Sequence, residues 1–169
     1  CTFTSVQAAY LVVVNQLSPP DGPAVDFTLT PGEAFPLAHD SRTFTIASGV
    51  AHELMAVAPD GWRRTAANCN NGDPLDAIIA NPGQTVTCTF AHEAMGRIIV
   101  TEQATPANTG QLFTFTADYD PAGNTLADGQ SNTSELLPPG TYSVSEIVPP
   151  GWMQSSATCD DGSAPAAIA

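Results

Sequence analysis

Four cysteines carry the best-defined chemistry in the sequence, and they lie at positions 1, 69, 88 and 159. Cys69 and Cys88 enclose eighteen residues, with no C-x-x-C motif and no histidine pair close by. Zinc sites normally take four ligands at closer spacing, and a catalytic thiol needs a neighbouring base. We therefore favour a structural disulfide between Cys69 and Cys88 over a metal site or a reactive thiol, which indicates an oxidising, extracellular environment.

Cys159 has no partner in its own half of the chain, and Cys1 is the remaining cysteine. If further sequence follows residue 169, we expect the partner of Cys159 to lie there. If the chain is a separate subunit, Cys1 of a neighbouring copy would supply both the thiol and part of an edge strand. Strand donation of this kind would join copies head to tail.

An acidic segment from Asp118 to Gly129 offers the oxygen ligands that calcium prefers. The candidate ligands are Asp118, Asp120, Asn124 and Asp128. Their spacing does not match an EF-hand, and residues 30–40, the corresponding segment of the first half, contain only Glu33 and Asp40. We predict a solvated acidic loop here and no bound metal.

The other polar residues do not suggest an active site. His39, His52 and His92 lie in separate segments of different character, and no G-x-S-x-G motif accompanies the serines and aspartates. We therefore predict neither enzymatic activity nor a cofactor. Asn132 begins the sequon Asn-Thr-Ser and is a candidate glycosylation site in a secreted protein.

An internal repeat positions these residues. The segment Leu136–Asp161 repeats the pattern of Ser48–Asn71 at an offset of 90 residues. The aligned pairs include Pro59/Pro149, Gly61/Gly151, Trp62/Trp152, Ala67/Ala157, Cys69/Cys159 and Gly72/Gly162. A fixed period is typical of modular arrays, so we interpret the two tryptophans as core or inter-module packing residues rather than sugar-binding platforms.

A second alignment sets the module boundary. Cys1-Thr-Phe-Thr matches Cys88-Thr-Phe-Ala at an offset of 87, which predicts modules at residues 1–87 and 88–169. The change of offset to 90 indicates a three-residue insertion, which we place in Asp118–Gly129. The chain ends where the counterpart of Ala80–Thr87 would begin. We expect a following segment or subunit to supply the closing strand of the second module, as in one period cut from a longer series.

Alternating apolar and polar residues between turns rich in proline and glycine predict an all-β fold. In the first module the expected strands are Tyr10–Asn15, Val25–Leu29, Arg42–Ile46, His52–Val57, Thr65–Cys69 and Gln84–Phe90. In the second they are Arg97–Glu102, Phe113–Ala117, Asn132–Leu137, Tyr142–Ile147 and Ser155–Cys159. About seven short strands per module are typical of an Ig-like β-sandwich.

The composition excludes several classes of partner. The chain has seventeen acidic residues, four arginines and no lysine, which gives a net charge of −13. Such a surface repels nucleic acids and anionic membranes. The longest apolar run, Ala8–Val14, is too short to span a bilayer. The chain opens on a cysteine without an initiator methionine or signal peptide, so we expect a processed product or a segment of a longer polypeptide.

The P-P-G-W turn at Pro149–Trp152 and the stretches Ser156–Ser163 and Gly83–Phe90 resemble the cysteine-containing, prealbumin-like (Cna-B type) repeats of secreted bacterial surface proteins and SpaA-like pilins. The resemblance covers nearly the whole chain and implies a stalk, spacer or fibre. Many members of that family form a Lys–Asn isopeptide bond assisted by an acidic residue. Glu146 stands at the acidic position, and its counterpart is Ala56. Without lysine the bond cannot form, so we expect the disulfide to replace it.

These observations predict two tandem Ig-like or prealbumin-like β-sandwich modules, the second without its closing strand. The favoured function is a structural subunit or segment of an extracellular filament, sheath or stalk on a bacterial cell surface. Its partners would be copies of itself or continuing repeats of the same polypeptide. The alternative is an adhesin whose loops at one sandwich end, Asp118–Gly129 above all, bind a protein or glycan.

Overall fold

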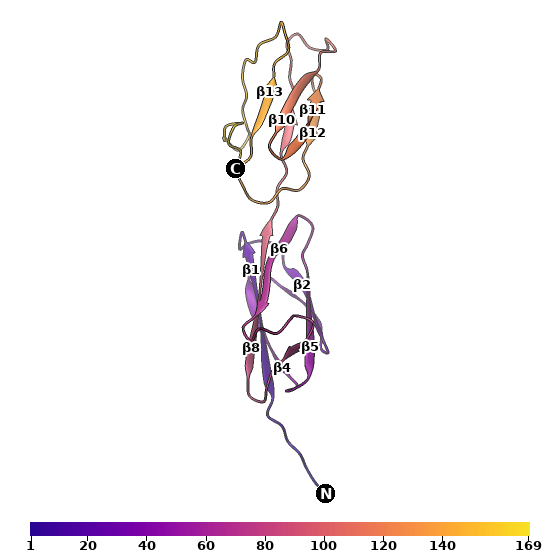
Figure 1. The fold of residues 1–169 in the computed structure, drawn as a ribbon, viewed down its shortest axis with the longest axis vertical. Coiled ribbons are helices and arrows are strands. Elements are labelled where there is room, and N and C mark those ends of the chain that lie inside the picture. Colours follow the sequence, from indigo (N-terminus) through magenta and orange to yellow (C-terminus); the bar gives the residue numbers. More distant parts are fainter. The chain divides into compact units, whose positions relative to one another are not determined.

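The computed structural model describes residues 1–169 and contains strands but no helix (Figure 1). The prediction of an all-β sandwich fold is confirmed, and nothing in the structure forms a helix able to cross a membrane. The chain divides into two compact units, Cys1–Ala94 and Met95–Ala169. The boundary follows Ala94 instead of residue 87, because the strand that carries Cys88 continues without interruption to Ala94.

The first unit consists of two four-stranded sheets. One has the strand order β4-β1-β8-β6, with β1 at Ala9–Ser18, β4 at Asp40–Ile46, β6 at Trp62–Cys69 and β8 at Thr85–Ala94. The other has the order β3-β2-β5-β7, with β2 at Val25–Thr30, β3 at Ala34–Leu37, β5 at Ala51–Val57 and β7 at Ile78–Ile79. The short strands β3 and β7 are additions to the expected set.

The core of the first unit follows from the two-residue period of its strands. Alternate residues of β1 and β8 point inward, so that Leu11 and Val13 of β1 and Phe90 of β8 are fully buried. The ring of Phe90 meets the ring of Phe27 edge to face, with centroids 5.0 Å apart. Phe27 in turn stacks on Phe35 at 5.5 Å. Phe27 and Phe90 belong to different sheets, so their contact joins the two sheets across the core.

The strands β1 and β8 lie side by side at the centre of their sheet and run parallel. Their pairing extends from Tyr10 opposite Thr85 to Ser18 opposite Glu93. The start of one strand of a parallel pair lies beside the start of the other. The chain therefore enters this pair at one end, through β1, and leaves it at the other end, through β8.

The second unit has fewer strands than the first. They are β9 at Ile99–Thr101, β10 at Phe113–Ala117, β11 at Asp120–Leu126, β12 at Ser131–Thr133 and β13 at Val144–Ile147. One sheet has the order β11-β10-β13, and β12 pairs with β9. Its core contains Phe113, Phe115 and Leu126, with Val100, Val144 and Trp152 packed against them.

The expected acidic loop at residues 118–129 is instead mostly the strand β11, which forms a hairpin with β10. Its sequence is polar, but Leu126 is buried in the core and the backbone pairs with β10. Gly123 makes this pairing possible, because its φ is 66° and a Cβ there would lie 2.7 Å from the carbonyl oxygen of Phe115. The strand was not predicted from the sequence because the segment is rich in Asp, Asn and Gly, which are typical of loops.

The expected strand at Ser155–Cys159 does not form. Its counterpart in the first unit, β6, is an edge strand whose only neighbour in the sheet is β8. The second unit contains no counterpart of β8, so the segment has no neighbour with which to exchange backbone hydrogen bonds. A strand-forming sequence without a partner strand remains irregular.

Candidate functional site

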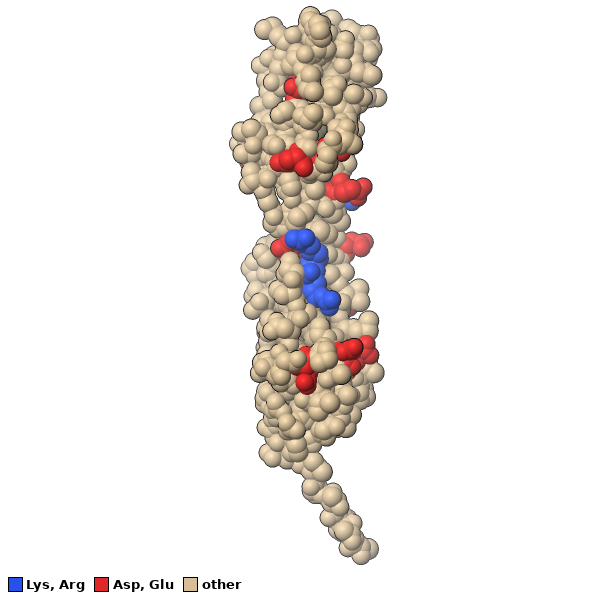
Figure 2. Space-filling model, in the orientation of Figure 1, with Lys and Arg blue, Asp and Glu red and all other residues tan.

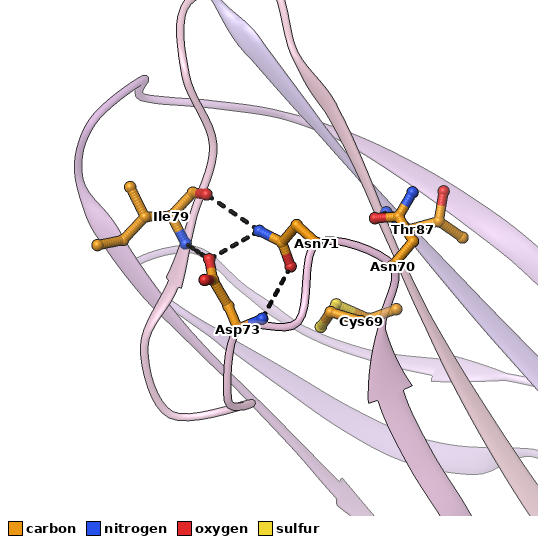
Figure 3. The surroundings of a disulfide bond; sticks show 7 residues. Cys69, Asn70, Asn71, Asp73, Ile79 and Thr87 are labelled. Atoms are coloured by element: carbon orange, nitrogen blue, oxygen red, sulfur yellow. Dashed lines mark hydrogen bonds between the residues drawn. A yellow bond between two sulfur atoms is a disulfide. The ribbon is translucent and has the colours of Figure 1, made fainter.

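The distinctive feature of the first unit is a disulfide between Cys69 and Cys88 (Figure 3). The two residues are directly opposed in the antiparallel pair of β6 and β8. Both side chains belong to the hydrophobic core, which shields the sulfur atoms from solvent. The bond therefore links the edge strand of the sheet covalently to its central strand.

Hydrogen bonds order the loop that the disulfide closes (Figure 3). Asn70 joins Thr87 twice: its backbone N–H donates to the carbonyl of Thr87 at 2.8 Å, and its side-chain oxygen accepts from the N–H of Thr87 at 2.9 Å. Asn71 donates to a carboxylate oxygen of Asp73 at 2.7 Å, and that oxygen accepts from the N–H of Ile79 at 2.8 Å. The loop is thus fixed by its own side chains.

The equivalent turn of the second unit contains Asp160 and Asp161 in place of the asparagines. Asp161 accepts hydrogen bonds from the backbone N–H and the hydroxyl of Ser163, at 2.8 and 2.7 Å. These bonds lower the pKa of Asp161 because they stabilise its charged form. The turn keeps its side-chain bonding, but Cys159 beside it is a free, half-buried thiol.

Cys1 is also free, and it lies in an exposed segment that forms no strand. The side chain of Phe3 is 94% exposed, which is unusual for a phenylalanine. The structure thus joins two of the four cysteines and leaves the other two as thiols.

A buried polar pair links β1 to β8, the strand that also carries Cys88. The Nδ1 of His92 lies 2.9 Å from the side-chain oxygen of Asn15, and the amide of Asn15 donates to the carbonyl of Leu37 at 2.8 Å. Burial lowers the pKa of His92, and the charge of Arg64 on the paired strand lowers it further. Both effects disfavour the charged form of the imidazole, which packs between β8 and β1.

The three histidines do not form one site. The Nδ1 of His39 lies 2.9 Å from the backbone nitrogen and 3.1 Å from the carbonyl oxygen of Leu17, so it accepts from the first or donates to the second according to its tautomer. His52 is buried on β5, where neither ring nitrogen has a partner, and it lines a shallow hollow with Leu29 and Phe44. No base, nucleophile and oxyanion donor converge around any of them.

Two of the candidate calcium ligands, Asp118 and Asp128, accept hydrogen bonds from the backbone of their own unit. Asp118 accepts hydrogen bonds from the N–H and hydroxyl of Ser143, both at 3.0 Å. Asp128 accepts from the N–H groups of Ala104 and Asn108, at 2.9 and 3.2 Å. No group of three or more His, Cys, Asp or Glu side chains is placed to hold a metal ion. These carboxylates stabilise turns, and the segment proposed for an adhesin is largely the hairpin strand β11.

Both tryptophans pack within their own units. The ring of Trp62 covers Gly22 so closely that a Cβ there would lie 2.2 Å from it, and Trp152 meets Phe113 edge to face at 5.1 Å. Asn132 lies half-buried in β12, opposite Val100. Glu146, at the acidic position of the isopeptide pattern, accepts a hydrogen bond from Gln154 at 3.1 Å.

Two of the four arginines form ion pairs with glutamates. Arg42 contacts Glu33 at 2.7 Å and lies over the rings of Phe35 and Phe44, each 4.9 Å from the ring centre. Arg63 donates to Glu93 at 2.6 Å. In Figure 2 the largest blue area lies over β6, and red side chains are scattered over the rest of the visible face. The visible face therefore combines scattered acidic side chains with a local basic area over β6.

Comparison with known families assigns the second unit. The family model described as a prealbumin-like fold domain matches residues 91–169. Those residues are thus similar to a prealbumin-like fold domain, and the resemblance seen in the sequence is confirmed there. No curated protein matches the chain.

Two of the solved structures that match the chain each cover about nine tenths of it. The TIE protein of Bacillus anthracis matches with a TM-score of 0.41 and 17% identity, over 89% of this chain and 31% of that one. A streptococcal ancillary pilin matches with a TM-score of 0.42 and 14% identity, over 91% of this chain and 58% of that one. The chain thus spans less than two thirds of the length of either structure.

Proposed function

We propose that the chain is a structural segment of an extracellular filament, sheath or stalk, and that its first unit resists tension. The observation that carries the proposal is the parallel pairing of β1 and β8, the first and last strands of that unit. Tension along the polypeptide pulls the start of β1 and the end of β8 in opposite directions. Because these points lie at opposite ends of the pair, the force shears the strands past each other.

Shear is the direction in which a strand pair resists force best. The pairing of β1 with β8 runs from Tyr10 opposite Thr85 to Ser18 opposite Glu93, and its hydrogen bonds must break together. If the strands were peeled apart from one end, the bonds would break one at a time. The inward-facing side chains Leu11, Val13 and Phe90 are fully buried and add the cost of exposing the core.

The disulfide extends this resistance to the edge of the sheet. It joins β8 to β6 and closes a loop with a sequence separation of 19 residues. Even when β1 and β8 separate, the residues between Cys69 and Cys88 cannot extend. A covalent clamp suits a chain that has no lysine and so cannot form the isopeptide bond of related repeats.

The charge distribution fits the same role. A net charge of −13 without any lysine keeps the surface soluble and limits lateral association at neutral pH. The partners in this proposal are copies of the chain or continuing repeats, outside the cell. The role is mechanical and needs no catalytic group or cofactor.

Single-molecule force spectroscopy on the full chain, pulled by its two termini, tests the proposal. Reduction should lengthen the extension released by the first unit by about 65 Å, because 19 residues at roughly 3.5 Å each become free. The variant Cys1→Ala/Cys159→Ala is the control and should behave as the unmodified chain does. An extension that does not depend on reductant would contradict the clamp. Unfolding of the first unit at forces no higher than those of the second, disulfide-free unit would contradict the tension-resisting role.

A further inference from the structure

The first unit has an open strand position beside β5. The short strand β7 pairs with β5 only at Ala51 and His52. Next to it along β5, the N–H of Leu54 donates to the carbonyl of Leu75 at 2.8 Å. Every second residue of a strand points its backbone groups to the same edge, so the N–H and carbonyl of Ala56 face this side as well. No strand lies there to receive them.

A hollow of about 550 Å³ lies along this open edge. It is lined by four consecutive residues of β5, Glu53–Ala56, together with Ala67 of β6 and Leu75. Ala56, Ala67 and Leu75 pack against the core but are each only partly buried. The core of the first unit is thus incompletely covered along this edge.

Two large apolar side chains of β5 beside the open edge are exposed to solvent. Met55 is 53% exposed and Val57 is 63% exposed. They alternate with the core-facing residues of the strand and so lie on its outer face. A strand added beside β5 would place its own outward-facing side chains next to them, as in other strand pairs. Apolar surface on both faces of the edge therefore favours an added strand.

Arg64 of β6 lines the same hollow and is exposed. It shares a face of β6 with Trp62 and, beyond an irregularity in the strand pairing, with Ala67, both of which pack against the core. The other three arginines each donate to an oxygen, whereas Arg64 has no hydrogen-bonding or ion-pairing partner. A guanidinium without a partner beside an apolar hollow is suited to bind a carboxylate.

The hollow is also lined by the carboxylates of Glu53 and Asp76, and neither forms an ion pair. An occupant therefore matches the charges of the hollow when it carries a cation as well as a carboxylate. A second copy of this chain is a poor match, because it has no lysine and a net charge of −13. The charges favour a segment of a different protein.

We propose that this edge of the first unit binds an extended segment of another protein, which adds a strand beside β5. An apolar side chain of that segment fills the hollow. Its carboxylate pairs with Arg64, and a lysine or arginine faces Glu53 and Asp76. Backbone hydrogen bonds to Ala56 contribute affinity, while the hollow and its charges select the side chains. This binding site goes beyond the mechanical role and does not depend on it.

The test uses the full chain and a synthetic peptide with blocked ends, Thr-Glu-Thr-Ile-Thr-Lys-Thr. Its glutamate, isoleucine and lysine face the same side when the peptide is extended. Titration followed by NMR should give saturable shifts of the amide signals of β5 and Leu75, and slower hydrogen exchange at the N–H of Ala56. Absence of saturable shifts, or shifts without protection of Ala56, would overturn the proposal.

Two arginine variants test the charge pairing. Arg64→Gln should weaken binding of the peptide about fivefold, as expected for an exposed ion pair, and should not change the affinity for a peptide with glutamine in place of glutamate. Arg63→Gln is the matched control, because Arg63 alternates to the other face of β6 and binds Glu93. It should change neither affinity. Equal effects of the two variants would overturn the assignment of Arg64.

Two further experiments test the added strand and its source. Of two peptides that are each N-methylated on the alternate N–H groups of one edge, one should lose binding and the other should retain it. The same affinity for both would overturn the strand pairing. Analytical ultracentrifugation of the chain without peptide should show no dimer that depends on Arg64. A dimer that Arg64→Gln abolishes would assign the hollow to a second copy and overturn the proposal of a different protein.

Discussion

Removal of the disulfide from the first unit should lower its free energy of unfolding by an amount that follows directly from the length of the loop that the bond closes. The bond closes a loop with a sequence separation of 19 residues. Cross-linking a loop of this length reduces the entropy of the unfolded chain and stabilises the fold by about 3 kcal/mol. Since small domains are stable by only about 5 to 15 kcal/mol, the bond is a large part of the total.

The variant Cys69→Ala/Cys88→Ala should therefore unfold at a markedly lower temperature. For a domain of this size, 3 kcal/mol corresponds to a fall in Tm of about 12 to 24 °C in the first unit. Differential scanning calorimetry of the full chain measures this directly, because the second unit provides an internal reference transition. Reductant added to the unmodified chain should have a similar effect.

The matched control is Cys1→Ala/Cys159→Ala, which removes the two free thiols and should leave the transition of the first unit in place. A Tm of the first unit that changes by less than about 3 °C on loss of the Cys69–Cys88 bond would refute the reasoning. It would mean that the hydrogen bonds between Asn70 and Thr87 already hold the loop as firmly as the covalent link does.

Three further predictions concern individual residues. Burial and Arg64 lower the pKa of His92, so the free energy of unfolding of the first unit, measured by urea titration, should be constant above about pH 6.5 and decrease at lower pH. The variant His92→Gln should remove this pH dependence. Burial and nearby carboxylates raise the pKa of Glu102, so the stability it contributes is present below about pH 4.5 and lost as pH rises; Glu102→Gln should raise the Tm of the second unit at pH 7 but not at pH 4. Gly123→Ala should destabilise the second unit by more than about 1 kcal/mol in the same titrations, because its φ is 66° and the new Cβ would meet the carbonyl of Phe115.

The regular strands were predictable because their side chains alternate. The expected Val25–Leu29 is β2 at Val25–Thr30, and Phe113–Ala117 is β10 with the same bounds. In both strands every second residue is apolar, and all of these side chains except the half-buried Ala117 are buried, so the sequence pattern and the packing carry the same information. The cysteine spacing likewise indicated which two residues face each other across β6 and β8.

Segments whose structure depends on which strand lies beside them were not predictable in this way. The strand β11 is polar, and what makes it a strand is pairing with β10 around Gly123. Ser155–Cys159 has a strand-like sequence and forms none, because its sheet position lacks a central neighbour. The buried pair of Asn15 and His92 joins residues far apart in the sequence, and no local pattern points to it.

The central claim is that the first unit resists tension through the shear of β1 against β8. Its most direct test compares two pulling geometries, with handles attached through unnatural amino acids at Ala9 and Ala94, or at Ser18 and Ala94. The first pair of points lies at opposite ends of the parallel strands and the second at the same end, because Ser18 is opposite Glu93. We predict a clearly higher unfolding force for Ala9 and Ala94. Equal forces in the two geometries would contradict the account.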